Sequence, residues 1–237
     1  MDGQEANTPI GEDLTVRQMR ATPIAVFVLM LATSIVSAGG GVFYGFGWIP
    51  LGDFRGVVMA VAWVVLFYVF AILIFRLFQA VLPLKIGEIA EGSRDEFIYH
   101  VYLLFYLIVF NPVMFSGLLP VPLARVFYQA LGARMGANSF PVGVILDPQF
   151  VTLGSNTIIG NGALLIPHVL EGRQLAHHPI VIGDTVTIGA RSVILSGVTI
   201  DDGATVAIGA VVAKGAHIGP SEVWGGMPAR CLQRKGA

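Results

Sequence analysis

The chain has 237 residues, of which 55% are hydrophobic and 12% are charged. Charged residues usually make up about 25% of a soluble globular domain, so a deficit of this size indicates lipid-facing surface. The net charge of −1 provides no global basic field for nucleic acid, and the single cysteine, Cys231, excludes an internal disulfide.

Two charge-free hydrophobic runs follow a polar N-terminal segment. Residues 1–20 carry acidic and basic side chains and are predicted to form a solvated tail. The stretches Pro23–Val42 and Gly56–Phe75 each reach the roughly 20 apolar residues that a helix needs to cross a bilayer core. We therefore expect two spans within a membrane region over residues 21–120.

A third uncharged run, Phe97–Leu123, is interrupted by Asn111-Pro112. Proline lacks a backbone donor and disfavours helix at the residue before it, so the run divides into two short pieces. One interpretation is a single kinked span. The other is a re-entrant pair of helices that enters and leaves on the same side of the membrane.

The distribution of basic residues bears on that choice. Only Arg55 lies between the first two spans, whereas the other side carries Arg17, Arg20, Arg76, Lys85 and Arg94. The positive-inside rule then places the N-terminus and the segment after the second span in the cytoplasm. A third full crossing would put the C-terminal half outside, so the re-entrant interpretation is preferred for a domain that uses a cytoplasmic substrate.

The next segment joins the membrane region to the rest of the chain. Val121–Met135 spaces its apolar residues as an amphipathic helix does and contains Arg125 and Arg134. Residues 121–137 are therefore predicted to form a helix in the membrane interface.

Isoleucine or valine recurs every six residues in the C-terminal half. The seven positions are Ile182, Ile188, Ile194, Ile200, Val206, Val212 and Ile218. A period of six fits a triangular coil in which each side is one short strand and its turn, and an amphipathic helix cannot produce it. The pattern predicts that the α-helical transmembrane region is followed by a left-handed parallel β-helix of hexapeptide repeats over residues 138–237.

The repeat changes phase once. Leu165 and Ile182 are 17 residues apart, one short of three full steps, which indicates an excursion over roughly Pro167–Pro179. Loops that leave a rigid scaffold tend to bear function. This one holds three of the five histidines, His168, His177 and His178.

These repeats resemble those of the hexapeptide-repeat acyltransferases, which include membrane-anchored members. The resemblance rests on VTLGSNTIIGNGALL (151–165), IVIGDTVTIGARSVILSGVTI (180–200), GATVAIGAVVAKG (203–215) and WGGMPAR (224–230). It implies a homotrimer, coenzyme A in the groove between adjacent coils, and a loop histidine as general base. The run LLIPHVLEGR (164–173) more loosely resembles the repeat domain that ends some membrane-embedded peptide synthetases.

Within this resemblance, His168 is the first candidate for the base, because imidazole titrates near neutral pH. Glu171, three residues later, or Asp147 across the coil could orient its ring. His178 and His177 are candidates for a direct role or for a structural role in closing the loop.

The resemblance also implies a coenzyme A site. Lys214 and Arg230 match positions that face the nucleotide end, and Arg191 is a further candidate. The pantetheine chain would lie along the backbone of Gly189, Ala190, Ala207 and Gly209. A backbone N–H near Gly162 or Gly189 could stabilise the oxyanion.

Together these features favour an acyl-CoA-dependent acyltransferase, with acetyl-CoA the expected donor and no metal. A soluble acceptor would not require anchoring, so a lipid-linked glycan, a lipid headgroup or a nascent polymer is expected. The predicted location is a bacterial inner membrane, with the β-helix in the cytoplasm. One alternative is a non-catalytic trimeric membrane scaffold. The other is a metal hydratase like the gamma-class carbonic anhydrases, although this chain lacks their His-x4-His pair.

Overall fold

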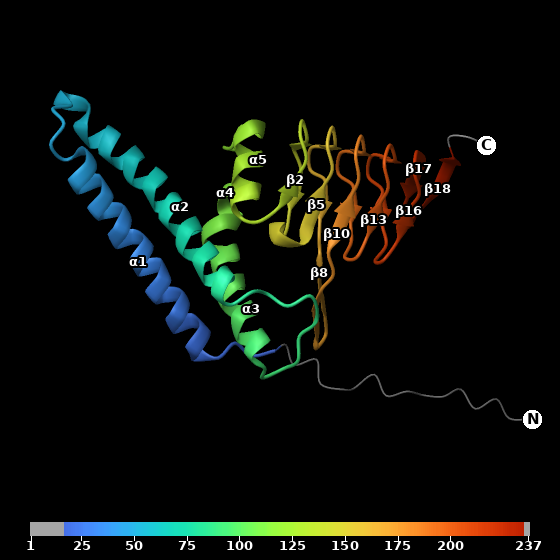
Figure 1. The fold of residues 1–237 in the computed structure, drawn as a ribbon, viewed down its shortest axis with the longest axis horizontal. Coiled ribbons are helices and arrows are strands. Elements are labelled where there is room, and N and C mark those ends of the chain that lie inside the picture. Colours follow the sequence, from blue (N-terminus) through green and yellow to red (C-terminus); the bar gives the residue numbers. More distant parts are fainter. Residues whose placement is uncertain (1–16, 235–237) are drawn as a thin grey trace, which may run out of the picture.

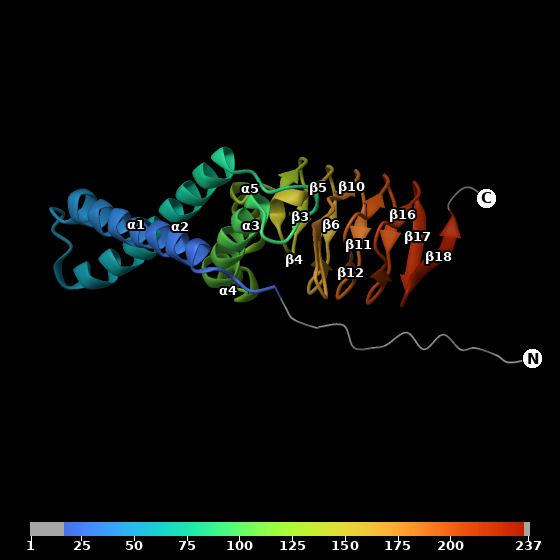
Figure 2. The same ribbon diagram turned by 90° about the horizontal axis from the view of Figure 1, so that it is seen from below.

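A computed structural model describes residues 17–234 and shows helices at one end of the molecule and a stack of strands at the other (Figure 1; Figure 2). Helices α1 (Ala21–Phe46) and α2 (Arg55–Val81) form an antiparallel hairpin, joined through the short helix η1 (Gly52–Phe54). Both expose large apolar side chains, and both are long and apolar enough to cross a membrane.

The third hydrophobic segment forms one continuous helix. It runs through α3 (Arg94–Phe105), the π-helical turn η2 (Tyr106–Phe110) and α4 (Asn111–Phe115). The predicted re-entrant pair is wrong in this form, because the chain does not reverse at Asn111-Pro112. In the π turn the N–H of Asn111 bonds to the carbonyl of Tyr106, five residues back, and this wider turn accommodates the proline within the helix.

Arg17, near the end of the predicted tail, is not fully solvated. Residues 1–16 lie outside the described residues, but only 11% of the Arg17 side chain is exposed. Its guanidinium lies 3.0 Å from the carboxylate of Glu96 and donates hydrogen bonds to the carbonyls of Ile89 and Arg173. Arg17 therefore ties the segment before α1 to α3 and to the loop of the C-terminal half.

The amphipathic helix is shorter than expected. Helix α5 (Val121–Ala130) ends seven residues before the predicted boundary at residue 137, and the first strand of the coil begins at Arg134 rather than 138. Leu123 and Val126 are exposed on α5, whereas Tyr128 is buried against the first coil. The helix thus covers the open end of the coil and leaves an apolar face uncovered.

The C-terminal half is a parallel β-helix with three sheets. Ile182 pairs with Ile200, 18 positions later, so three six-residue steps complete one coil. The strands are β2 (Arg134–Met135), β3 (Phe140–Pro141), β4 (Val144–Ile145), β5 (Val151–Leu153), β6 (Ile158–Ile159), β7 (Leu164–Leu165), β10 (Ile180–Ile182), β11 (Thr187–Ile188), β12 (Val193–Ile194), β13 (Thr199–Ile200), β14 (Thr205–Val206), β15 (Val211–Val212) and β16 (His217–Ile218). The antiparallel pair β17 (Glu222–Gly226) and β18 (Ala229–Arg234) closes the far end.

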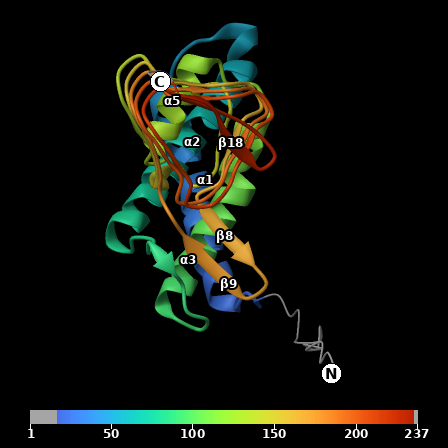
Figure 3. The same cartoon turned by 90° about the vertical axis from the view of Figure 1, so that its right-hand side faces the viewer.

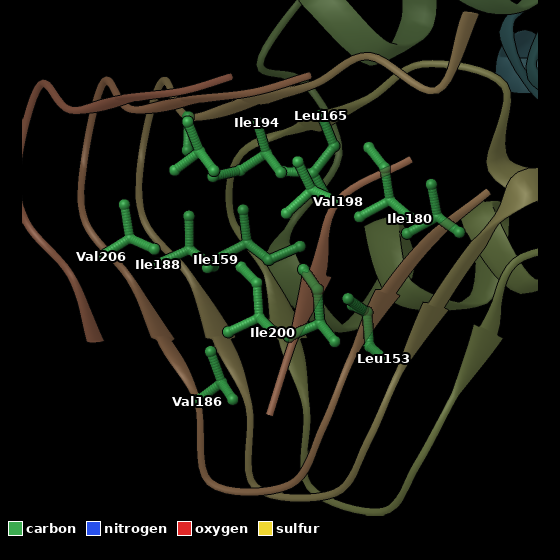
Figure 4. Close-up of a cluster of buried hydrophobic side chains, with 14 of the residues drawn as sticks. Leu153, Ile159, Leu165, Ile180, Val186, Ile188, Ile194, Val198, Ile200 and Val206 are labelled. Carbon is green, nitrogen blue, oxygen red and sulfur yellow. The ribbon is translucent and has the colours of Figure 1, made fainter. Parts of the chain in front are cut away.

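The six-residue repeat forms the core of this coil. All seven repeat positions from Ile182 to Ile218 are at most 1% exposed. In Figure 4, Ile159, Ile188 and Val206 lie in a row, one from each successive coil. Each coil therefore buries its apolar side chains against equivalent ones in its neighbours, as in other solenoids.

The predicted excursion is an antiparallel hairpin that leaves the coil. It consists of β8 (His168–Glu171) and β9 (Gln174–His177), and Figure 3 shows it extending away from the coil beside α3. Strand β9 also pairs with β1 (Gly87–Glu88), from the segment after α2. The loop is thus fixed on its other edge by the helical half of the molecule.

Candidate active site

His168 and Asp147 lie together where the hairpin leaves the coil. Nδ1 of His168 is 2.5 Å from Oδ2 of Asp147. Asp147 precedes the 3-10 helix η3 (Pro148–Phe150) and has a left-handed backbone, with φ of 46°. The carboxylate is buried, whereas 30% of the imidazole side chain is exposed. This geometry fixes one ring nitrogen, and Nε2 has no hydrogen-bond partner in the described part of the chain.

A third side chain comes from the helical half. The hydroxyl of Tyr102, on α3, donates a hydrogen bond of 2.6 Å to Oδ1 of Asp147. Both carboxylate oxygens of Asp147 therefore have a partner, one from the hairpin and one from α3. Figure 3 shows α3 alongside the hairpin.

The contact between His168 and Asp147 shifts the pKa of both side chains. Burial alone would lower the pKa of His168, but the hydrogen bond and charge of Asp147 outweigh it and raise the pKa. Burial alone would raise the pKa of Asp147, but the hydrogen bonds from His168 and Tyr102 and the nearby imidazoles lower it. Asp147 thus stays ionised and stabilises the protonated form of the His168 imidazole.

Glu171 does not take the orienting role considered for it. Its carboxylate forms an ion pair with Lys214 at the tip of the hairpin, and both side chains are largely exposed. Nδ1 of His168 faces Asp147, so Asp147 and not Glu171 contacts the imidazole in this structure. Lys214, predicted to face the nucleotide, contacts the hairpin through Glu171.

His177 and His178 have different surroundings. His177 is fully buried and its ring stacks on Phe150, with centroids 4.6 Å apart. Burial lowers its pKa, which favours the neutral ring. The backbone of His178 bonds to Pro167 and Gly197 and closes the base of the hairpin. The contacts that the structure shows for these two residues are therefore packing and backbone contacts.

The residues predicted to line pantetheine differ in how much space a ligand would find beside them. A Cβ on Gly189 would lie 2.5 Å from the backbone N of Ile208, and the Gly189 N–H already donates to Val206. Gly189 is therefore required by coil packing, and its N–H is not free for an oxyanion. By contrast, Gly209 has open space beside it, and Ala190 and Ala207 are partly exposed.

The remaining basic candidates lie on the outside of the coil. Arg230, on β18, and Arg191 are both exposed. The Arg230 guanidinium donates to the carbonyl of the neighbouring Ala229. Both stay available to an anionic ligand, and neither contacts the His168–Asp147 pair.

Tyr102 is the site residue that the sequence predictions missed. The signal was its spacing, since Tyr99, Tyr102 and Tyr106 recur on one face of a helix within an otherwise apolar run. Side chains with a polar tip in such a run usually find a partner when buried. The partner, Asp147, is 45 residues away and could not be identified from spacing.

Comparison with known proteins supports the repeat. Residues 179–214 match the family model described as "Hexapeptide repeat of succinyl-transferase". The putative acetyltransferase YvoF of Bacillus subtilis is 38% identical over 58 residues, which are 24% of this chain and 34% of that protein. The mitochondrial gamma carbonic anhydrase 1 of Arabidopsis thaliana is 38% identical over 106 residues, covering 37% of this chain and 38% of that protein.

Among solved structures, a hexapeptide-repeat acetyltransferase of Vibrio cholerae in complex with acetyl coenzyme A is similar with a TM-score of 0.44. It is 23% identical, and the match covers 65% of this chain and 97% of that one. The chain spans only about a third of the length of the curated relatives it matches.

Proposed function

We propose that this chain is an acetyl-CoA-dependent acetyltransferase that modifies a membrane-associated acceptor, with His168 as the general base. The observation that supports this most directly is the 2.5 Å contact between His168 Nδ1 and the buried carboxylate of Asp147. Such a contact sets the tautomer of the ring and stabilises the imidazolium that forms during proton transfer.

The proposed reaction needs no covalent enzyme intermediate. Nε2 of His168 accepts the proton of an acceptor hydroxyl or amine as the acceptor attacks the thioester carbonyl of acetyl-CoA. The tetrahedral intermediate then loses the thiolate of coenzyme A, which takes that proton from the imidazolium. Asp147 stays ionised throughout and holds the ring.

The donor site follows from the family resemblance. Pantetheine would lie along Ala190, Ala207 and Gly209, with Arg230 or Arg191 near the phosphates. In the proposed homotrimer of left-handed coils, the groove between two subunits completes the site and brings the thioester to His168.

The membrane placement has support within the chain. Three helices could cross a membrane by length and composition, and in this proposal only α1 and α2 do so, whereas the helix from Arg94 to Phe115 does not cross. Strand β1, directly after α2, pairs with β9 of the hairpin, and Arg17, directly before α1, bonds to Arg173 at the hairpin tip. A sheet cannot form across a bilayer. We therefore propose that the hairpin and the β-helix lie on the same side as the N-terminus, the cytoplasmic side by the charge distribution.

The test uses the full chain in detergent, with free coenzyme A measured by chromatography. We expect wild-type protein and His168→Ala to bind acetyl-CoA equally, and only wild type to release coenzyme A, with a difference of about 10²–10⁴-fold. Absence of binding by both proteins at millimolar acetyl-CoA would reject the enzyme proposal and favour the trimeric scaffold.

A metal hydratase is a second candidate because of the likeness to gamma carbonic anhydrase 1. The chain lacks the expected histidine pair, and His168 directs Nδ1 at Asp147. We expect zinc neither to bind stoichiometrically nor to confer hydration of carbon dioxide. Zinc bound at one ion per subunit interface, with hydratase activity, would replace the transferase proposal.

A further inference from the structure

A cavity of about 290 Å³ lies where the end of α2 meets the first coil. Its lining includes Arg76 and Gln79 from α2, Arg134 from β2, and Gln149 from η3. The surrounding apolar residues come from the segment after α2 and from the coil. Four nitrogen-bearing side chains from three separate elements thus meet at the junction of the two halves.

Among residues 17–234 these side chains have no hydrogen-bond or ion-pair partner, and the two arginines are exposed to solvent. Gln79 is only 7% exposed, and neither its Nε2 nor its Oε1 has a hydrogen bond within residues 17–234. The Nε2 of Gln149 is likewise buried without an acceptor. In that same part of the chain Arg76 and Arg134 form no ion pair, and no acidic side chain lines the cavity. The cavity has two positive charges and no counter-charge.

The backbone makes room for one of the guanidiniums. A Cβ at Gly132 would lie 2.6 Å from Nη1 of Arg76, so a larger residue there would displace the arginine. A buried amide without a partner costs stability, which a ligand that accepts its hydrogen bond would offset. The unpaired amides and the arginines therefore point to an absent anionic acceptor.

We propose that this cavity binds a phosphate group. Guanidinium groups match phosphate oxygens in a two-pronged geometry, and amide N–H groups supply further donors. The cavity adjoins the end of a helix apolar enough to cross a membrane. Ile86 in its lining is exposed, as are Leu77 and Val81 near the end of the same helix. Phospholipid headgroups occupy this level, so the first source to test is a lipid phosphodiester. This source depends on the membrane placement proposed above, but not on acetyl transfer.

The test measures binding to the full chain in a nonionic detergent. One arm titrates dioctanoyl-phosphatidylglycerol and the other glycerol 1-phosphate, each by calorimetry. Arg76→Gln and Arg134→Gln should each raise the Kd by about tenfold, the loss expected for one charged contact. Arg94→Gln is the matched control, since this exposed arginine at the start of α3 lies outside the cavity.

Binding of the lipid alone, weakened only by the cavity substitutions, supports a membrane source. Binding of both probes with the same pattern supports the phosphate site with a soluble source as well. Equal Kd values for wild type and both cavity variants, or an equal loss with Arg94→Gln, would overturn the proposal. An equal loss with Arg94→Gln would show that the anionic probe is attracted by the overall positive charge and not by the cavity.

A substitution at Gln79 separates binding from folding. Gln79→Leu removes two unsatisfied buried atoms at nearly constant volume, so the ligand-free protein should melt at the same or a higher temperature. The same variant should bind phosphatidylglycerol more weakly. A lower melting temperature together with unchanged binding would assign Gln79 a structural role and contradict the proposed site.

Discussion

The pairing of His168 with Asp147 predicts how activity depends on pH. The base must be neutral to accept a proton, and its pKa is raised by Asp147. The rate of coenzyme A release should therefore rise with pH, with a midpoint above the usual value of about 6.5. In Asp147→Asn burial remains but the charge is lost, so the midpoint should fall below that value. An unchanged midpoint would exclude His168 as the titrating base.

The same pair contributes to stability within a defined pH window. His168 has a raised pKa, so its contribution is complete below about pH 6.5 and is lost as the pH rises through the folded-state pKa. Asp147 has a lowered pKa, so its contribution is present above about pH 4 and is lost as the pH falls. The difference in Tm between wild type and Asp147→Asn should be largest between these limits.

Tyr102 is proposed as a positioning residue that acts through its hydrogen bond to Asp147. Tyr102→Phe should lower the free energy of unfolding by about 1.5–3 kcal/mol, the usual loss for a buried hydrogen bond to a charged group. With its carboxylate less stabilised, Asp147 should attract the imidazolium more strongly, so the pH midpoint of activity should rise. A purely structural role would reduce stability without moving that midpoint.

At this scale the sequence predicts His168 as the base, which stays a prediction, and does not decide which carboxylate contacts it. Glu171 and Asp147 were both plausible, one near in sequence and one a full coil away. The hairpin that holds His168 and Glu171 makes two non-local contacts, the pairing of β9 with β1 and the ion pair between Lys214 and Glu171. Neither contact has a sequence pattern of its own.

The repeat positions predict unequal costs of truncation along the coil. Ile194 is fully buried in the core, whereas Ile208, elsewhere in the β-helix, is 77% exposed. Ile194→Ala should lower the free energy of unfolding by about 2–5 kcal/mol in urea titrations. Ile208→Ala is the control and should change it by less than about 0.5 kcal/mol in the monomer. A large loss for Ile208→Ala instead would indicate that this face is buried in an assembly.

The hairpin should become more accessible to protease when the hydrogen bonds between it and the N-terminal segment are removed. Arg17 donates to the carbonyl of Arg173 at the hairpin tip and pairs with Glu96. In Arg17→Gln, trypsin should cut after Arg173 faster than in wild type. Arg20→Gln, a neighbouring exposed arginine, should leave the rate unchanged. Equal rates in all three proteins would show that Arg17 does not hold the hairpin.

At the scale of elements, periodic features were predictable and non-local ones were not. The six-residue period correctly predicted the coil, and the one phase break correctly predicted an excursion between Pro167 and Pro179, although not that it forms a hairpin. The break predicted at Pro112 was wrong, because a π turn absorbs the missing donor without ending the helix. Strand β1 has two residues and pairs far along the chain, so no local signal marks it.

For the whole molecule, the single cysteine is a natural reporter of the side on which the β-helix lies. Cys231 is exposed on β18. A membrane-impermeant maleimide should label it in inverted membrane vesicles but not in intact spheroplasts of a bacterial host.

Asp53→Cys in a Cys231→Ser background should give the opposite result, since η1 joins the far ends of α1 and α2. Labelling of Cys231 in intact spheroplasts would place the β-helix outside and contradict the supply of cytoplasmic acetyl-CoA.

The hydrogen bond from Tyr102 to Asp147 also limits how this architecture can be recombined. A soluble fragment starting at the first coil would keep the histidine and the aspartate but lose one of the groups that satisfy the carboxylate. Grafting the coil onto a different anchor would have the same effect. A fragment that keeps all three side chains must therefore begin at α3. A chimera would have to take α3 and the β-helix from the same protein.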